Sequence, residues 1–546
     1  MSIAGWHGDE RTVGTPLGDA ELVALRRTRL FGATGTVLMA IGALGAGARP
    51  VVQDPTFGVR LLNLPSRIQT VSLTMTTTGA VMMALAWLML GRFALGRRRM
   101  TRSQLDRTLV LWIIPLLFAP PMYSKDVYSY LAQSQIAHNG QDPYRVGPAP
   151  GLGLDHVFTL SVPSLWRETP APYGPLFLWI GSGISELTGE NIVAAVLCHR
   201  LLVLLGVALI VWATPRLARR CGVAEVSALW LGAANPLLVM HLVAGIHNEA
   251  LMLGLMLAGV EFALRGIDSS KRLLPRPLLP LGARWGPAAM LVLGAVLITM
   301  SSQVKLPSLL ALGFVAMALG HRWGSTVKAF FLASGGLGLL SLGVMAVIGW
   351  ASGLGFGWLS TLGTANVVRS WMSPPTLLAL GTGQVGILLG LGDHTTAVLS
   401  LTRSIGVLII MVVVTWLLLA VFRGRLHPVG GLGVALGATV LLFPVVQPWY
   451  LLWAIIPLAA WATRPGFRIA AIGGTLVVGI FGPTANGDRF ALFQIIDATL
   501  ASTVIVLLLI AITYHRLPWR ALPPDATSSA PANSRNGPAD AYAESP

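Results

Sequence analysis

Long apolar segments recur along almost the whole chain, and they limit what it can fold into. Hydrophobic residues make up 54% of the 546 residues and charged residues only 11%, whereas a soluble protein carries about 25% charged residues. A chain with so few polar groups cannot cover its apolar surface in water, and about 20 apolar residues suffice for a helix to cross a bilayer. The segments lack the alternation of barrel strands, so we expect an all-α polytopic membrane protein.

The apolar segments predict about 14 transmembrane helices. The expected spans are 30–48, 70–95, 108–121, 191–214, 226–243, 246–264, 287–303, 305–319, 328–350, 397–421, 430–446, 449–463, 468–482 and 494–515. Two further segments, 174–187 and 374–392, are short or interrupted by glycine and begin with prolines. We expect them to be re-entrant or kinked helices, which a membrane tolerates where protein or water satisfies the backbone.

Charge sets the orientation of these spans. With the two short segments not crossing and the N-terminus inside, about 26 of the 38 Lys and Arg residues fall in inside loops, as the positive-inside rule requires. Both termini are then cytoplasmic, and the segments 49–69, 122–190 and 351–396 lie outside. Because the cations lie in short loops between spans, the net charge of +16 does not indicate a nucleic-acid partner.

One membrane domain between two polar ends is the expected organisation. Residues 1–29 form a cytoplasmic segment, residues 30–515 the transmembrane domain, and residues 516–546 a disordered cytoplasmic tail rich in Pro, Ala and Ser. No signal-peptide core precedes the first span, so we expect that span to be retained. The two cysteines, Cys198 and Cys221, allow no disulfide framework and no metal cluster.

Asp126 is the most informative polar residue of the chain. It lies in the sequence Tyr-Ser-Lys-Asp-Val-Tyr-Ser-Tyr at 123–130, directly after an apolar run, and so falls at a membrane surface. Ser124 is expected to cap a helix that carries Asp126 in its first turn and ends at Asn139-Gly140. The residue pattern suits a helix lying in the interface. A carboxylate placed here suggests chemistry on a membrane-bound molecule, although it could also only stabilise the helix N-terminus.

Further polar residues are expected on the same side of the membrane. His247-Asn248-Glu249 occupies the outer turn between two predicted spans, and Lys305 and Arg369 lie at outer junctions, where cations are unusual. The turn could simply be solvated, and Lys305 could reach lipid headgroups rather than bind a phosphate.

Aromatic residues and a buried arginine complete this inventory. Tyr128 and Tyr173 fall in the predicted outer segment, at the depth where aromatic side chains anchor a protein in the interface. Arg200 lies within a predicted span, where a buried arginine is costly unless it is paired. Glu186 or Glu190 could be its partner.

Acid, cation and aromatic groups on one side of a membrane are what glycosyl transfer from a lipid phosphate requires. The transition state resembles an oxocarbenium ion, a carboxylate accepts the proton of the acceptor hydroxyl, and cations neutralise the departing phosphate. A lateral groove between helices would hold the lipid tail.

Three sequence segments extend this hypothesis to a known family. The run 123–130, followed by Asp-Pro-Tyr at 142–144, resembles the GT-C superfamily of polytopic glycosyltransferases, which carry a catalytic Asp or Glu in their first large outer loop. Thr-Pro-Ala-Pro-Tyr-Gly-Pro at 169–175 and Gly-Ile-His-Asn-Glu at 245–249 are similar to the polyprenyl-phosphomannose-dependent α-1,6-mannosyltransferases of mycobacterial and corynebacterial lipomannan synthesis. The similarity covers about residues 25–515 and is greatest to the B-type paralogue.

The resemblance implies a GT-C fold, a polyprenyl phosphate mannose donor, and a mannosylated phosphatidylinositol-type glycolipid acceptor. It implies an inverting reaction on the extracytoplasmic face of the plasma membrane, with residues 30–515 as the catalytic domain and 122–190 as its catalytic loop. Asp126 matches the acid of the family and would be the general base. Ser124 stands where the family motif often has a second acid, which weakens the case for a metal ion held by two carboxylates. The positive charge of Lys125 could serve in place of that metal ion. No cofactor is expected.

Eight residues are expected from their position to bind donor or acceptor: Lys125, Tyr128, Tyr173, His247, Asn248, Glu249, Lys305 and Arg369. Three alternatives remain open. A transporter or flippase for a lipid-linked sugar would need a similar cavity, a scaffold for envelope assembly would tolerate replacement of Asp126, and an arabinosyltransferase would share the fold.

Overall fold

The structure, a computed structural model, is dominated by long helices that run side by side. It describes residues 14–96, 98–269, 286–364, 369–370, 372–481 and 490–519. Within them, strands are limited to β1 (Thr15–Pro16) and β2 (Arg98–Arg99), which pair in parallel. The predicted all-α architecture is confirmed, while residues 1–13 and most of the predicted tail 516–546 lie outside the described residues.

Seven helices of the described residues are long and apolar enough to cross a membrane. They are α1 (Asp19–Ala46), α3 (Gln69–Leu95), α10 (Ile192–Arg220), α12 (Glu249–Ser269), α15 (Val327–Ser352), α17 (Thr395–Phe422) and α21 (Leu492–Thr513). Shorter apolar stretches are α13 (Pro287–Ser302), η6 with α14 (Leu306–Leu309, Leu310–Arg322), α18 (Pro428–Leu442), η9 with α19 (Pro448–Tyr450, Leu451–Ala459) and α20 (Pro465–Phe481). The total of about 14 crossings stays a prediction.

The two remaining predicted spans, 108–121 and 226–243, are broken helices. The first holds the end of α4 (Arg102–Ile113) and the 3₁₀ turn η2 (Ile114–Leu117). The second starts with α11 (Glu225–Leu231), which stops before Asn235-Pro236 because the residue before a proline avoids the α conformation. The chain resumes as a π-helical turn, η3 (Leu238–Ala244), a form that is frequent at functional sites.

Close helix packing joins α3 to both α1 and α11. A Cβ on Gly79 of α3 would lie 2.3 Å from the carbonyl oxygen of Gly35 of α1, so small residues are needed for the backbones to approach this closely. Trp87 of α3 stacks on Trp230 of α11 at 4.9 Å. Each indole N–H donates to the carbonyl of the other residue.

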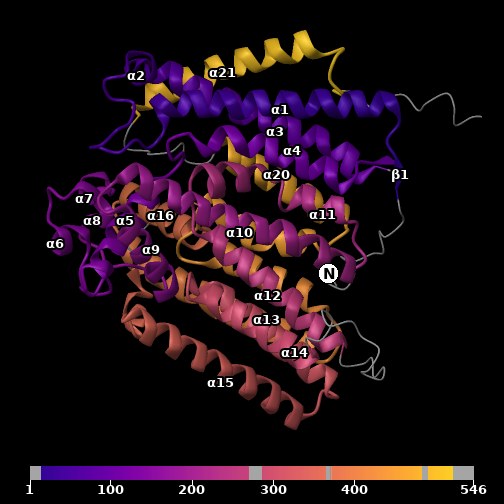
Figure 1. Cartoon of the computed structure of the whole chain (residues 1–546). Coiled ribbons are helices and arrows are strands. Elements are labelled where there is room, and N and C mark those ends of the chain that lie inside the picture. The colour runs from indigo at the N-terminus through magenta and orange to yellow at the C-terminus, as the bar shows by residue number, and fades with distance from the viewer. Residues whose placement is uncertain are drawn as a thin grey trace, which may run out of the picture.

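The predicted outer segment 122–190 forms a cluster of short helices at one end of the long ones, on the left of Figure 1. The helices are α5 (Asp126–His138), α6 (Pro148–Leu152), α7 (Val157–Ser161), α8 (Ser164–Arg167) and α9 (Pro175–Thr188), with α2 (Arg60–Arg67) at the same end. The sequence places Gln133 on the more polar side of α5, where exposure to solvent is expected, but that exposure is not found. Its side chain is 1% exposed, because α7, α9 and α10 pack around the helix.

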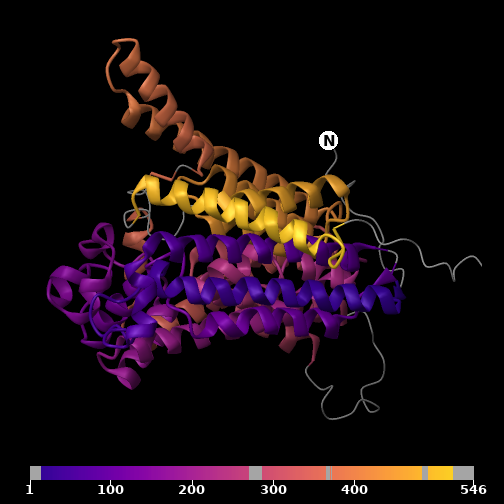
Figure 2. The same cartoon turned by 90° about the horizontal axis from the view of Figure 1, so that it is seen from above.

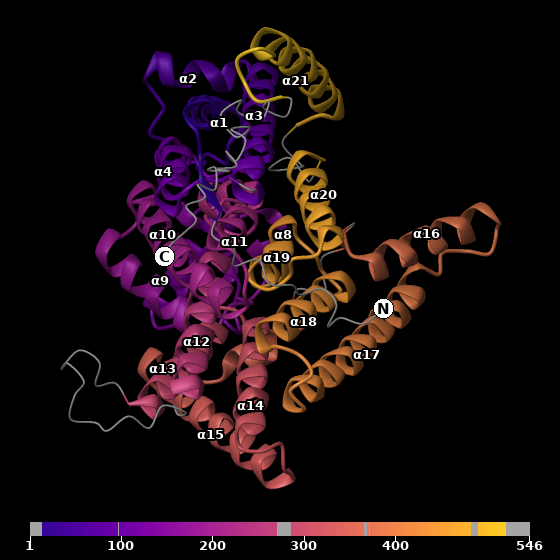
Figure 3. The ribbon, with the colours of Figure 1, turned by 90° about the vertical axis from the view of Figure 1, so that its right-hand side faces the viewer.

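The helical hairpin of α16 (Pro374–Leu388) and α17 leans away from the other helices, as Figures 2 and 3 show. Large apolar side chains cover its surface, among them Leu388 and Leu401. In a membrane protein such a surface faces lipid tails. The buried polar cluster described next lies among the other helices.

Candidate active site

Asp126 begins α5, as the sequence predicts. Its backbone N–H donates to the hydroxyl of Ser124 at 3.0 Å, and the helix ends at Asn139-Gly140, where Gly140 has a φ of +75°. The side chain of Asp126 is 27% exposed. The carboxylate therefore stands at a helix N-terminus, where a negative charge is favoured, and it remains open to a ligand.

Two strained backbone segments meet beside Asp126. The N–H of Met122 donates to the carbonyl of Ala244 at 2.9 Å. Tyr123 on one segment and Ile246 on the other have φ values of +62° and +58°, a region that is unusual for bulky and β-branched residues. Strain of this kind persists only where the surroundings enforce it, and it clusters at functional sites.

His247 lies beside the carboxylate of Asp126. Its Nδ1 lies 3.5 Å from Oδ2 of Asp126, and its side chain is fully buried. The indole of Trp449 stacks on the imidazole with ring centroids 3.5 Å apart and an angle of 21° between the planes. This stacking fixes the ring of His247 against the carboxylate.

Glu249 and Lys305 form an ion pair next to this group. The side chain of Glu249 is 1% exposed and that of Lys305 is 20% exposed. Nζ of Lys305 also donates to the hydroxyl of Tyr450 at 3.0 Å and lies 4.6 Å from the centre of that ring. A lysine held by three contacts keeps its charge at a fixed point.

The loop before α9 positions Lys305. The N–H of Gly174 donates to the carbonyl of Val304 at 3.2 Å. A Cβ on Gly174 would lie 2.2 Å from the carbonyl oxygen of Gln303, so only glycine permits this approach. The neighbouring Tyr173 contacts Tyr130 of α5 edge to face, with ring centroids 5.1 Å apart.

Burial sets the charge states in this cluster. It raises the pKa of Asp126 to about 6, and the negative charge of Glu249 adds to this increase. The hydrogen bond from Ser124 and the positive charge of Lys305 lower the pKa and so oppose the increase. Burial, and then the charges of Asp126 and Glu249, raise the pKa of Tyr173 well above its usual value. Asp126 is thus ionised at neutral pH but basic enough to accept a proton, and the Tyr173 hydroxyl remains a donor.

Several buried polar atoms of the cluster have no hydrogen-bond partner among the described residues. They are both ring nitrogens of His247, both amide atoms of Asn248, Oε2 of Glu249 and both amide atoms of Gln303. Buried polar atoms are normally paired, so each such exception calls for an explanation. A polyhydroxylated ligand such as a sugar can supply the partners.

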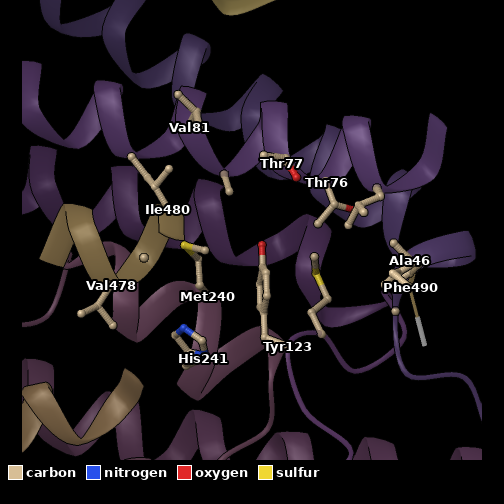
Figure 4. Close-up of a pocket in the computed structure, with 15 residues that line it drawn as sticks. Ala46, Thr76, Thr77, Val81, Tyr123, Met240, His241, Val478, Ile480 and Phe490 are labelled. Atoms are coloured by element: carbon tan, nitrogen blue, oxygen red, sulfur yellow. The ribbon is translucent and has the colours of Figure 1, made fainter. Parts of the chain in front are cut away.

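A mostly apolar pocket is lined by Tyr123 and His241 (Figure 4). Met240, Val478 and Ile480 contribute to its wall. The Tyr123 hydroxyl points toward α3 there and has no hydrogen-bond partner among the described residues. Its ring lies 5.3 Å from that of His241, so the pocket adjoins the cluster.

The structure brings together five of the nine predicted site residues. Asp126, Tyr173, His247, Glu249 and Lys305 are linked by the contacts and charges above, and Asn248 lies between two of them in the chain.

Three predicted residues lie elsewhere. Tyr128 turns away to donate to the carbonyl of Ala48 at 2.6 Å. Lys125 lines a neighbouring surface hollow. Arg369 is exposed. It interacts electrostatically with Asp393 and Arg403, away from the cluster.

Sequence reasoning missed Trp449, Tyr450 and Gln303 as site residues. An adjacent Trp-Tyr pair at a predicted outer turn was the available signal for the first two. Gln303 carried no signal beyond its place two residues before Lys305. No group of three or more His, Cys, Asp and Glu side chains suited to a metal occurs in the described residues.

This arrangement combines the parts of a glycosyl-transfer site. A carboxylate with a pKa of about 6 can act as a general base, a fixed lysine can stabilise a departing anion, and unpartnered amides and aromatic rings suit a sugar.

Comparison with known proteins gives the family. A family model described as alpha-(1->6)-mannopyranosyltransferase, N-terminal domain, matches residues 29–321, and a model described as the MptB C-terminal domain matches residues 375–511. A probable alpha-(1->6)-mannopyranosyltransferase of Mycolicibacterium smegmatis is 80% identical over 100% of this chain and 98% of its own length. Alpha-(1->6)-mannopyranosyltransferase B of Corynebacterium glutamicum is 40% identical over 83% of this chain and 76% of its own.

Among solved structures, an archaeal oligosaccharyltransferase of Archaeoglobus fulgidus matches with a TM-score of 0.35 and 12% identity, over 80% of this chain and 56% of that one. A similarity of that size carries no argument. The family matches identify the chain as a glycosyltransferase, and they exclude the transporter and scaffold alternatives. The chain is a polytopic membrane glycosyltransferase that belongs to the alpha-(1->6)-mannopyranosyltransferase family and, as the sequence resemblance predicts, is most similar to its B-type members.

Proposed function

We propose that the enzyme transfers mannose from a polyprenyl phosphate mannose donor to a mannosylated glycolipid of phosphatidylinositol type and extends an α-1,6-linked mannan backbone with inversion. The observation that carries the proposal is a partly exposed carboxylate, Asp126, beside the buried ion pair of Lys305 and Glu249. Base and cation then lie within one cluster, as transfer from a phosphate ester requires.

Asp126 is the general base of the proposed reaction. The acceptor hydroxyl oxygen attacks the anomeric carbon, the bond from that carbon to the phosphate oxygen breaks, and the hydroxyl proton moves to the Asp126 carboxylate. A pKa of about 6 suits this role, because a base is most effective when its pKa lies near the working pH. His247, 3.5 Å away, positions the carboxylate.

Lys305 stabilises the phosphate as it departs. Its ammonium group is oriented by Glu249 and the Tyr450 hydroxyl, so no reorganisation is needed when negative charge develops on the leaving oxygen. Glu249 compensates the lysine charge before the substrate arrives, because a buried unpaired cation would be costly.

The unpartnered polar atoms and the aromatic rings hold the sugar. Asn248 and Gln303 offer amide donors and acceptors. The Tyr173 hydroxyl adds a donor, since its raised pKa keeps it protonated. These contacts orient mannose for attack, which is where enzymes of this kind gain much of their rate.

The proposed location is the plasma membrane, with the site on the extracytoplasmic face. Two features support it. The cluster lies at the end of the long helices where α5 to α9 gather (Figure 1), and the positive-inside distribution assigns the predicted segment 122–190 to the outside.

The test uses the full-length enzyme in membrane vesicles with labelled polyprenyl phosphate mannose. Asp126→Asn is expected to reduce mannose transfer about 100-fold or more, the range for loss of a general base. Asp142→Asn is the matched control, because Asp142 lies in the same outer segment but accepts from the N–H of Tyr144 in a turn. If Asp126→Asn retained most of the wild-type activity at equal protein level, the base assignment would be wrong.

A further inference from the structure

A groove that is lined by none of the residues assigned to the proposed reaction lies on the α1 side of α5. It has a volume of about 280 Å³. Its wall is formed by the segment after α1, by α2, by the chain after η2, and by the first turns of α10. Among the lining residues are Arg49, Leu62, Phe118, Tyr128, Leu197 and Arg200. We call it the arginine groove.

Arg200 is a buried cation with unused donors. The residue is 2% exposed, one guanidinium nitrogen donates to the carbonyl of Leu117, and Nε and Nη2 have no hydrogen-bond partner among the described residues. The expected pairing with Glu186 or Glu190 is wrong. Those side chains are 73% and 60% exposed, and they pair with histidines, because they lie around the end of α9, at the surface.

The buried donors of Arg200 therefore call for an anion. A buried charge without a partner is strongly unfavourable, whereas a guanidinium is well suited to a phosphate, which it binds through two parallel hydrogen bonds.

Arg49 provides a second, preorganised cation in the same groove. One of its terminal nitrogens lies 3.1 Å from the carboxylate of Asp54, and it also donates to the Thr56 hydroxyl at 2.8 Å and to the Asn63 side chain at 3.2 Å. Nε of Arg49 is buried and has no hydrogen-bond partner among the described residues. With two arginines and one aspartate, the groove carries an excess of positive charge.

The groove has an exposed apolar side and a side that borders the surface hollow beside Lys125. Phe118 and Leu197 are 81% and 43% exposed at its apolar side. On the other side it adjoins a surface hollow with which it shares Arg49, and that hollow is also lined by Lys125, the neighbour of Asp126. Apolar chains can thus lie against the exposed apolar side while a polar headgroup extends toward Lys125.

The position of the groove favours the acceptor over the donor as its occupant. In an inverting displacement the attacking hydroxyl and the leaving phosphate lie on opposite sides of the anomeric carbon. Lys305 follows α13, which lies in the lower half of Figure 1, whereas α1 and α2, which border the groove, lie at the top. Two lipid substrates that approach from these two sides do not compete for the same cations.

We propose that the arginine groove binds the anionic phosphodiester headgroup of the acceptor lipid, with Arg200 and Arg49 on the phosphate and the lipid chains along α10. This inference deepens the proposed function and rests on it for the identity of the acceptor. The binding itself can be measured without any sugar transfer.

The test measures lipid binding by the purified full-length protein in detergent micelles, using native mass spectrometry with added phosphatidylinositol or phosphatidylcholine of matched chains. Preferential binding of phosphatidylinositol is expected, and Arg200→Gln is expected to weaken it at least about tenfold, as the loss of a charge-assisted bidentate contact implies. Arg216→Gln is the matched control on the same helix, since Arg216 bonds to the Trp212 carbonyl away from the groove. Its affinity should equal that of the wild type.

Two further variants separate the possible outcomes. Leu197→Trp fills the lipid-facing side without changing charge and should also weaken phosphatidylinositol binding, which covers the case in which Arg200→Gln does not fold. Asp126→Asn should bind phosphatidylinositol as the wild type does, so failure of the proposed base leaves this result interpretable.

Three results would overturn the proposal. The first is equal phosphatidylinositol affinity in the wild type, Arg200→Gln and Leu197→Trp. The second is Arg200-dependent binding of polyprenyl monophosphate but not of phosphatidylinositol, which would assign the groove to the donor. The third is competition by millimolar inorganic phosphate with no preference for a lipid.

Discussion

Lys305 and Glu249 form an ion pair that is almost closed to solvent, yet Oε2 of Glu249 has no hydrogen-bond partner among the described residues. The pair therefore fixes the lysine while leaving one carboxylate oxygen for a further donor. A sugar hydroxyl can fill that position. Breaking such a pair on one side leaves an uncompensated buried charge, whereas removing both charges does not.

Glu249→Gln should destabilise the enzyme and reduce mannose transfer. The loss of one partner of a buried pair costs about 3 kcal/mol, and the freed lysine loses its orientation toward the leaving phosphate. The double variant Glu249→Gln/Lys305→Met should unfold at a higher temperature than Glu249→Gln alone but remain inactive. Thermal unfolding in detergent and the transfer assay give the two readouts. Equal unfolding temperatures for the single and double variants would contradict the pair.

The pH profile of transfer should report Asp126. Because burial raises its pKa to about 6, the ionised base is the main form at pH 7 and is lost as the pH falls. kcat/KM should therefore decline about tenfold per pH unit below that value. The measurement is initial rate against pH in membrane vesicles, with Asp142→Asn as the control. An acidic limb near pH 4 would contradict the raised pKa.

The same raised pKa predicts a gain in stability when the charge is removed. The pKa of this carboxyl is near its usual value of 3.8 in the unfolded state and about 6 in the folded state, so the native state binds the proton more tightly. The contribution of this carboxyl to the free energy of unfolding is greatest below pH 3.8. It falls as the pH rises through about 6 and stays low above that pH. Asp126→Asn should therefore unfold at a slightly higher temperature than the wild type at pH 8, with the difference vanishing near pH 4.

Much of the fold could be predicted from the sequence, because membrane helices are long and uniform in composition. Each predicted span coincides with a helix or a broken helix. The N-cap of α5 is Lys125 rather than the expected Ser124, although the Ser124 hydroxyl accepts from the N–H of Asp126. Helices that pack on one another within the protein are harder to predict. The burial of α5 depends on α7, α9 and α10, which are distant in the sequence or connected through turns.

The site could be predicted only where polarity stood out against an apolar background. Asp126, Glu249 and Lys305 are such residues, because a charge at membrane depth, next to an apolar span, is rare and usually functional. Trp449 and Gln303 belong to types that also occur at interfaces without a function, so pattern alone could not select them. The pairing of Arg200 could not be predicted either, since it depends on where α9 ends relative to α10.

Trp449 should be needed to orient His247 against Asp126. The rings stack at 3.5 Å, and an aromatic pair contributes about 0.5–1.5 kcal/mol beyond its buried area. Trp449→Leu should lower kcat/KM about tenfold, whereas Trp449→Phe, which keeps an aromatic face, should stay closer to the wild type. Trp350→Ala is the control, because that side chain is 85% exposed. Equal losses in the Leu and Phe variants would indicate that bulk rather than stacking matters.

Gly174 should be intolerant of even one methyl group, because the Lys305 segment is packed onto it. A Cβ there would lie 2.2 Å from the carbonyl oxygen of Gln303, so Gly174→Ala must push the segment 303–305 away from Tyr173 and move the lysine. A displacement of about 1 Å in a catalytic group can cost about 100-fold in rate. We expect a loss of that size in the transfer assay, at normal protein level.

Gly183→Ala provides the matched control for this substitution. A Cβ on Gly183 of α9 meets no atom within 4 Å, and alanine in a helix is more stable than glycine by about 1 kcal/mol. That variant should therefore retain full activity and unfold at the same temperature or higher. If Gly174→Ala were as active as Gly183→Ala, the close approach of Gly174 to Gln303 would not be what holds Lys305 in place, and the lysine would have to be positioned by Glu249 and Tyr450 alone.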